Sequence, residues 1–417
     1  MINKTHLLKT KEIFKYDWQL IIAIILLCSI GLAFLASSLN NDPVKYWPEL
    51  LKQFFVGIGF GSIITVILAK TDYHILTKHS KILITITFIL LGFLAFFAIL
   101  ILPKTTVTEK YNTIQSFSWL PIRPHIANGA VRWIDLPLGL PNVQPSEIAK
   151  ITLLIYFASS LSKVQRNGFD WQNLKRPFWT FGIITFLVLI QPDLGTVIMV
   201  FTIIFSSMLV ANVPKQILTK VTLVCLIIAF IAIISTPYRR QRFLIYADFF
   251  KVFTKDDPKD DTKEDKIDKQ QVENIQWAMR NGGWFGKGYG NSELKQAKMI
   301  YEASTDSIIA VIGEEIGFVG TISFLCLYLW LFWRGMKIAS EAKDLEGQMI
   351  ATGISIWIFT QVFLNVCGMT GLIPMKGLPL PFVSQGGTAI VMNLVGIGIL
   401  LNISSQRKAG FNQRSNL

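Results

Sequence analysis

The stretch ILITITFILLGFLAFFAILIL, residues 82–102, contains no charged side chain and is long enough to cross a bilayer as one helix. Similar apolar runs lie on both sides of it, at 18–38, 53–69, 146–161, 178–190, 194–211, 218–235, 306–333, 349–370 and 386–403. The run at 178–190 is short, and only QPDLGT separates it from the next one. Together the runs predict an all-α integral membrane protein with about ten transmembrane helices.

The composition agrees with a membrane protein. Of the 417 residues, 52% are hydrophobic and 16% are charged, whereas soluble globular proteins contain about 25% charged residues. These values exclude a water-soluble enzyme of several domains, a disordered protein and a secreted disulfide scaffold. The net charge of +13 does not indicate nucleic-acid binding, because so apolar a chain would have to bind from within a bilayer. The four cysteines stand apart in the sequence, so no metal site is predicted from them.

The positions of lysine and arginine predict how the helices are oriented. Nineteen of these cations fall in the two tails and in the connections on their side, and seven fall in the short loops opposite. Because cytoplasmic loops are enriched in Lys and Arg, both termini are expected in the cytoplasm. The predicted organisation is a cytoplasmic tail (1–17), helices one to seven (18–235), one large extracytoplasmic loop (236–305), helices eight to ten (306–403) and a second cytoplasmic tail (404–417). Within the large loop, KDDPKDDTKEDKIDKQ (255–270) is expected to be a solvated insertion.

Two polar groups are predicted where the chain leaves the membrane on the outer side. In GAVRWIDLPLGLPNVQPSEIAK (129–150), Arg132 precedes an amphipathic loop, and Glu147 and Lys150 are spaced to pair on one helix face. This pair is either a structural ion pair or part of a site in which Lys150 or Arg132 binds an anionic head group. In QPDLGT (191–196), proline and glycine break the helix, so Asp193 either caps the next helix or lines a cavity.

Two further groups flank the last three helices. The segment NGGWFGKGYGNSELKQAKMIYEASTDS (281–307) contains glycines that permit a close backbone approach to a ligand, and it also contains Lys295. Asp306 falls at the start of the eighth helix, where it serves either in catalysis or as an N-terminal cap, with Ser304 and Thr305 as other possible caps. The loop PMKGLPLPFVSQGG (374–387) is rigid and has Lys376 as its single charge. It is either an ordered turn or a phosphate-binding loop.

These groups predict an outward-facing cavity with cations for an anionic, lipid-linked substrate and with Asp306 as an acid or base. The candidate cations are Arg132, Lys150, Lys295 and Lys376. Such a cavity suits a protein that moves the lipid as well as one that reacts with it.

The sequence resembles the shape, elongation, division and sporulation (SEDS) family from the first apolar run to the tenth. GGWFGKGYGNSELK and MKGLPLPFVSQGG are more similar to members that act in cell division than to those that act in elongation. The resemblance implies a ten-helix peptidoglycan glycosyltransferase that polymerises lipid II in the bacterial cytoplasmic (inner) membrane, at the division septum. It also implies a class B penicillin-binding protein as the transpeptidase partner, other divisome partners and no nucleic acid.

The family motif LPEAHTDF matches IYEASTDS here, which implies that Asp306 is the catalytic aspartate and that Glu302 is the motif glutamate. Tyr301, Ser304 and Ser307 depart from the motif, and Gln385 stands where the family has tyrosine in PFVSYGG. The implied reaction inverts the donor sugar, with Asp306 as general base and a divalent cation, Mg²⁺ or Mn²⁺, as a possible cofactor. The substrate-binding candidates are Arg132, Glu147, Lys150, Asp193, Lys295, Glu302, Lys376 and Ser384. A lipid II flippase, an elongation polymerase and a non-catalytic division scaffold are the alternatives.

Overall fold

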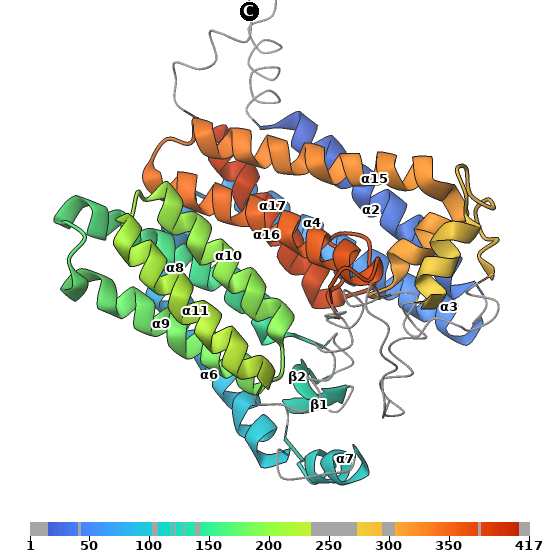
Figure 1. Cartoon of the computed structure of the whole chain (residues 1–417), viewed down its shortest axis with the longest axis horizontal. Helices are drawn as coiled ribbons and strands as arrows, with labels where there is room; N and C mark the ends of the chain where they lie inside the picture. The colour runs from blue at the N-terminus through green and yellow to red at the C-terminus, as the bar shows by residue number, and fades with distance from the viewer. Residues whose placement is uncertain are drawn as a thin grey trace, which may run out of the picture.

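The computed structural model describes residues 16–40, 43–101, 107–117, 119–120, 122–127, 130–137, 142–234, 273–293, 305–373 and 377–407. Within these ranges the chain is mainly helical (Figure 1). The helices are α2 (Trp18–Leu39), α3 (Pro43–Leu51), the π-helix η1 (Lys52–Phe60), α4 (Gly61–Lys70), α5 (Tyr73–Lys78), α6 (Ser80–Ile101), α7 (Val107–Gln115), α8 (Pro145–Asn167), α9 (Trp171–Ile190), α10 (Leu194–Val210), α11 (Lys215–Ile234), α15 (Ile308–Glu341), α16 (Leu345–Met369) and α17 (Gly387–Ser405). The strands are β1 (Arg123–Ala127) and β2 (Ala130–Asp135).

Within the described residues, each apolar run predicted from the sequence overlaps a helix, and η1 and α4 together form the second. Among the described residues, six helical stretches are long and apolar enough to cross a membrane, namely Trp18–Leu39, Tyr46–Lys70, Ser80–Ile101, Ile308–Glu341, Leu345–Met369 and Gly387–Ser405. α10 is a shorter apolar helix. The prediction of a helical, multi-pass membrane protein is therefore confirmed.

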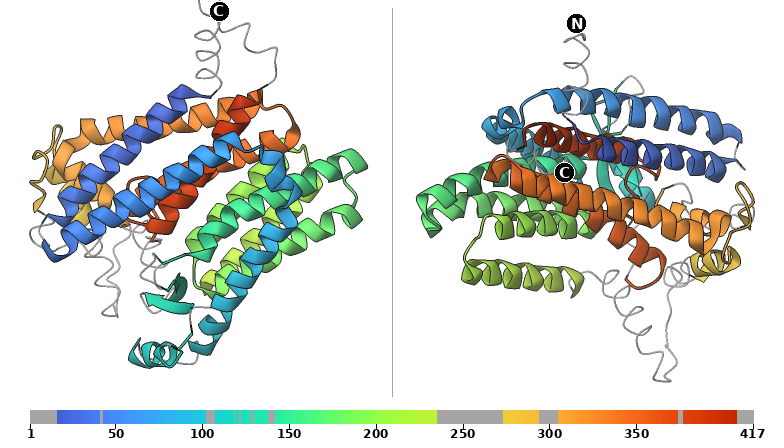
Figure 2. Two further views of the ribbon diagram at one scale, coloured as in Figure 1. Left: turned by 180° about the vertical axis from the view of Figure 1, so that it is seen from behind. Right: turned by 90° about the horizontal axis from the view of Figure 1, so that it is seen from above.

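The helices form two groups that meet at α16. One group contains α2, α4, α15, α16 and α17, and the other contains α6 and α8 to α11 (Figure 1 and Figure 2). α16 packs against α15 and α17 in its own group and against α8 and α10 in the other, and its Trp357 is fully buried. Large apolar residues are exposed on the outer faces of the helices; Ile25 on α2 is 59% exposed and Ile89 on α6 is 63% exposed. Lipid chains can cover such apolar outer faces.

An aspartate directly precedes the first residue of three of the helices. Asp17, Asp193 and Asp344 precede α2, α10 and α16, and each carboxylate accepts a hydrogen bond from the amide of the third helical residue, at 3.1, 3.0 and 2.7 Å. An aspartate in this position satisfies an amide that has no partner within the helix. The sequence therefore fixes where these helices begin.

One prediction of the fold was incomplete, because the described residues include a small antiparallel hairpin, β1–β2. Arg132 and Trp133 lie in β2, a strand that the sequence had not predicted. Val131 and Ile134 are buried in a cluster that includes Phe97 of α6. The strand register shifts at one point along β1, which breaks the strict alternation that signals a strand in a sequence.

A buried ionic cluster joins the first and last described helices. The Asp17 carboxylate pairs with Arg334 of α15 and with Arg407, whose Nη2 is 2.6 Å away. Arg407 also pairs with Glu341 at 3.0 Å, and the Asp17 amide donates to Ser404 Oγ at 3.3 Å. The start of α2 and the end of α17 therefore lie at the same end of the molecule.

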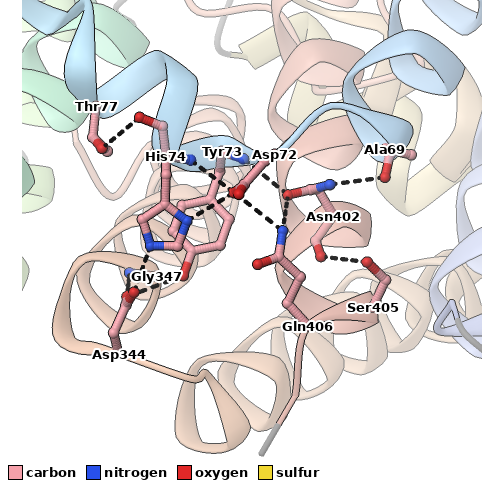
Figure 3. Close-up of polar contacts among 10 residues, drawn as sticks. All are labelled: Ala69, Asp72, Tyr73, His74, Thr77, Asp344, Gly347, Asn402, Ser405 and Gln406. Carbon is pink, nitrogen blue, oxygen red and sulfur yellow. Dashed lines mark hydrogen bonds and ion pairs between the residues drawn. The ribbon is translucent and has the colours of Figure 1, made fainter.

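A second polar cluster at this end connects three parts of the chain (Figure 3). His74 of α5 lies between Asp72 and Asp344, with its Nδ1 and Nε2 atoms 2.7 and 2.6 Å from the two carboxylates. The Tyr73 hydroxyl donates to Asp344 at 3.0 Å, and the Tyr73 amide donates to Asn402 Oδ1 at 3.0 Å. The cluster thus ties the α4–α5 turn to the α15–α16 turn and to α17.

Electrostatics in this cluster favour a charged His74. Burial disfavours the imidazolium, but hydrogen bonds and charges from Asp72 and Asp344 outweigh burial and raise the pKa of His74. Burial likewise opposes the ionised form of Asp344, but hydrogen bonds from the Gly347 amide, His74 and Tyr73 outweigh it and lower the pKa of Asp344. His74, Asp72 and Asp344 lie outside the membrane-spanning helices.

We expect the thermal stability of the purified protein to fall as the pH rises past the raised pKa of His74. The contribution of this group is complete below its unfolded pKa, near 6.5, and is lost as the pH rises through the higher folded value. Asp344 contributes above its unfolded pKa, near 3.8, and loses its contribution as the pH falls through its lowered folded value. Because the two side chains are 39% and 33% exposed, the effect should be about 0.2–1 kcal/mol.

Unfolding midpoints measured in detergent from about pH 6 to about pH 8 check this expectation. His74→Gln should remove the decline. His79→Gln is the matched control, because His79 lies nearby and contacts the carbonyl of Ile75 at 2.9 Å. An unchanged pH dependence in His74→Gln would contradict the assignment.

Candidate active site

The predicted pair on α8 forms at the end of the molecule opposite Asp17. Lys150 Nζ donates to Glu147 Oε1 at 2.8 Å, and the two side chains are 0% and 3% exposed. The prediction that they pair on one helix face is confirmed. Glu147 Oε2 is buried and has no hydrogen-bond partner among the described residues. The pair is therefore shielded from solvent, and removing either partner would leave an isolated buried charge.

Lys150 faces α16. Its ammonium lies 4.7 Å from the centre of the Trp357 ring, which is a cation–π contact. Gln361 Oε1 accepts a hydrogen bond from Trp357 Nε1 at 3.0 Å and lies 3.5 Å from Lys150 Nζ, at the limit for such a bond. Lys150 is therefore held within the protein by α8 and α16.

Asp193 and Arg132, two other residues that the sequence predicted on this side, stabilise the break between α9 and α10. Asp193 caps α10, one of the two alternatives that the sequence left open, and its Oδ2 also accepts from Thr196 Oγ1 at 2.7 Å. Ser146 at the start of α8 donates to the same oxygen at 3.4 Å. Arg132 Nη2 donates to the carbonyl of Pro192 at 2.8 Å. Arg132 and Asp193 thus hold the β2 strand, the helix break and α8 together.

Asp306 lies just before α15, beside the segment 377–386, which we call the 377–386 loop. α15 begins at Ile308 with Ser307 as its N-cap residue, so Asp306 lies one residue before the capping position that was one of its two alternatives. Asn365 Nδ2 donates to the backbone oxygen of Asp306 at 2.9 Å. A Cβ atom placed on Gly377 would lie 3.1 Å from Asp306 Oδ2. The carboxylate of Asp306 therefore lies close against the loop.

The 377–386 loop is held by side chains from within it and from α16. Ser384 Oγ accepts from the Leu380 amide at 2.8 Å, so this predicted substrate-binding hydroxyl also closes the loop on itself. Gln361 Nε2 donates to the carbonyl of Pro379 at 2.7 Å. Gly377 has a φ of +62°, a left-handed conformation that glycine adopts without strain.

Gln385, where the resembled family has tyrosine, joins the loop to α3. Its Nε2 donates to Glu49 Oε2 at 2.5 Å. Next to it, Gln53 of the π-helix η1 donates to the Ser384 carbonyl at 3.2 Å and accepts from the Gly386 amide at 3.5 Å. Single turns of π-helix are frequent at functional sites, and here the π-helix supports the loop beside Asp306.

The glycine-rich segment lies close against the backbone of α15. A Cβ atom on Gly282 would lie 2.2 Å from the carbonyl oxygen of Gly313, and one on Gly286 would lie 2.1 Å from that of Glu315. α15 is broken at Gly317, where φ is +69°, and the segment packs into this break. The glycines therefore permit a close approach to α15, and the predicted approach to a ligand is not what the structure shows.

Three candidates, Lys295, Glu302 and Lys376, lie outside the described residues, together with Tyr301, Ser304 and the insertion 255–270. Among the residues that the structure does describe, no group of three or more His, Cys, Asp or Glu side chains lies close enough to hold a metal ion. The described carboxylates alone therefore do not fit a protein-held metal site, and no catalytic step is assigned to a metal.

Gln361 and Asn365 were not among the predicted site residues; they lie one turn apart on α16 and are 0% and 3% exposed. Both donate to the 377–386 loop, and they contact Lys150 and Asp306 respectively. A signal was present, because polar side chains within an apolar membrane run are costly and usually functional. The two amides in QVFLN (361–365) are therefore a sequence signal for a functional site.

Comparison with known proteins shows similarity over nearly the whole chain. The chain is 30% identical over 412 residues to a protein of Geobacter metallireducens named probable peptidoglycan glycosyltransferase FtsW, covering 98% of this chain and 99% of that one. A protein of the same name from Geobacter sulfurreducens is 31% identical over 409 residues, covering 96% of this chain and 98% of the relative.

Solved structures share the fold. A chain from a study of how a peptidoglycan synthase complex coordinates polymerization and crosslinking matches with a TM-score of 0.69 at 23% identity, covering 94% of this chain and 99% of that one. The rod shape determining protein RodA of Thermus thermophilus matches with a TM-score of 0.63 at 22% identity, covering 94% of this chain and 97% of RodA. A family model described as cell cycle protein FtsW/RodA/SpoVE matches residues 17–409, and the chain belongs to this family.

Proposed function

We propose that this protein is a peptidoglycan glycosyltransferase that polymerises lipid II during cell division. The observation that carries the proposal is the similarity, over nearly all of both chains, to proteins named probable peptidoglycan glycosyltransferase FtsW. The geometry supports it, because a carboxylate, Asp306, lies beside an ordered loop at the end of the helices where Lys150 and Arg132 are also found.

The reaction joins the 4-hydroxyl of one sugar to the anomeric carbon of a donor. The bond to undecaprenyl pyrophosphate breaks, the new glycosidic bond forms from the opposite face, and the hydroxyl proton goes to a base. We assign the base to Asp306, because a carboxylate within reach of the hydroxyl can take its proton as the bond forms. A single displacement of this kind inverts the anomeric carbon.

The departing pyrophosphate needs positive charge near it. Lys150 and Arg132 are the described candidates, and Lys295 and Lys376 are candidates outside the described residues. Glu147, Asp193, Glu302 and Ser384 complete the proposed substrate-binding set. A divalent cation shared between the substrate and the protein belongs to the same proposal, and activity with EDTA against activity with added Mg²⁺ or Mn²⁺ tests it.

We further propose that the protein works in the bacterial cytoplasmic (inner) membrane with both termini in the cytoplasm. The septum, a class B penicillin-binding protein and other divisome proteins complete this proposal. The division role rests on the FtsW names of the relatives and on the two division-like motifs. Septal labelling of a tagged copy supports it, whereas lateral-wall labelling supports an elongation role.

Purified protein incubated with lipid II tests the activity. A glycan polymer is the expected product, and the products can be separated by size on a gel. In sealed vesicles, movement of lipid II across the bilayer without polymer would favour a transporter. Neither polymer nor movement, with loss of division on deletion of the gene, would favour a scaffold.

A further inference from the structure

We infer that Asn365 is a positioning residue that sets where Asp306 lies relative to the 377–386 loop. This inference rests on the proposed function, in which Asp306 is the base. Asn365 Nδ2 donates to two backbone oxygens at once, that of Asp306 at 2.9 Å and that of Leu378 at 2.7 Å. One amide group therefore joins the residue that bears the base to the loop beside it.

The two bonded segments depend on side chains for their relative position. Asp306 lies before the first turn of α15, and Leu378 lies in the 377–386 loop, so no helical hydrogen-bond ladder relates them. Asn365 itself lies in the interior of α16, a 25-residue helix packed on several sides. α16 is thus a rigid support, and the hydrogen bonds of Asn365 hold the two irregular segments in position relative to it.

The direction of the amide group is determined by its surroundings. If the amide were rotated by half a turn, Oδ1 would face the two carbonyl oxygens and both hydrogen bonds would be lost. In the present direction, Oδ1 is buried and has no hydrogen-bond partner among the described residues. A buried acceptor without a partner costs about 1–3 kcal/mol, so the amide is a poor choice for stability alone.

Gln361 extends the same arrangement by one helical turn. It donates to the loop at Pro379 and lies beside Lys150, while Asn365 donates to the loop at Leu378 and to Asp306. α16 therefore presents two amides that align one loop with a candidate cation and with the candidate base. A displacement of about 1 Å at a reacting group can lower a rate about 100-fold.

The test is Asn365→Asp, which preserves the size of the side chain and removes the NH₂ group that donates both hydrogen bonds, since a carboxyl group can donate at most one. We expect the turnover number for lipid II polymerisation, per folded molecule, to fall about 10- to 100-fold with KM changed less than about twofold. The small change in KM is expected because the amide acts on Asp306 and the loop. Asn365→Ser provides a second variant, since its shorter hydroxyl can reach at most one of the two carbonyls, and its turnover should fall at least about tenfold.

Asn402→Asp is the matched control. Asn402 is also a buried amide on a membrane helix that joins separate segments, donating to Ala69 at 2.9 Å and accepting from Tyr73 at 3.0 Å, but it lies at the opposite end. Its turnover per folded molecule should stay within about threefold of the wild type. Wild-type turnover in folded Asn365→Asp or Asn365→Ser, alongside an inactive Asp306→Ala, would overturn the positioning role alone. No polymer from the wild-type protein would overturn both proposals.

Discussion

Asp306→Ala is expected to abolish glycan polymerisation by the purified protein and to leave expression and folding intact. Without its base, the acceptor hydroxyl must lose its proton to water, and general base catalysis contributes about 10²- to 10⁴-fold to such reactions. Asp306→Asn should reduce the rate as strongly, because it retains the shape of the side chain and cannot accept a proton. Lipid II polymer measured on gels, against the amount of monodisperse protein, checks both variants.

The matched control for removing a carboxylate is Asp170→Asn. Asp170 precedes α9, where its side chain makes no capping hydrogen bond, and this variant should polymerise lipid II like the wild type. If Asp306→Ala made polymer at the wild-type rate, Asp306 could not be the base. A loss of polymer accompanied by aggregation would not qualify as support, so the unfolding midpoint belongs in the same experiment.

The parts of this protein that local sequence determines were predictable. Apolar runs determine the helices because a bilayer leaves the backbone no other regular way to satisfy its hydrogen bonds. The spacing of Glu147 and Lys150 places them on one helix face whatever surrounds them, and they do pair. Asp193 follows a proline at a helix break, which made capping one of its two expected roles, and it does cap α10.

The contacts of Asp306 were not predictable in the same way. Its nearness to Gly377 and its bond from Asn365 join residues of three different segments, so they depend on how α15, α16 and the 377–386 loop pack. The motif match identified the residue and gave no geometry. The glycines at 282 and 286 show the converse error, because a glycine permits any close approach and does not specify whether a ligand or a helix backbone is the neighbour.

The second large effect concerns the buried pair of Glu147 and Lys150, in which single and double substitutions should differ. Glu147→Leu alone leaves a buried lysine without its counter-charge, and Lys150→Met alone leaves a buried carboxylate. Each is expected to destabilise the protein by about 3–5 kcal/mol. The double variant leaves neither charge and fills the site with apolar groups, so its unfolding midpoint should return close to the wild-type value or above it.

The turnover number distinguishes an ion pair that only stabilises the fold from one whose lysine also takes part in catalysis. If Lys150 supplies positive charge to the departing pyrophosphate, as proposed, the double variant should be folded yet polymerise lipid II about 100-fold more slowly or worse, which is the effect of removing one stabilising group from a transition state. Two residues of the buried ionic cluster at the other end, Asp17 and Arg334, provide the control. Asp17→Leu with Arg334→Met should preserve turnover per folded molecule. Full turnover in the Glu147→Leu, Lys150→Met protein would show that the pair is purely structural, because a cation that can be replaced by methionine without loss of rate does not stabilise the leaving group. The departing pyrophosphate would then be stabilised by Arg132, Lys295 and Lys376.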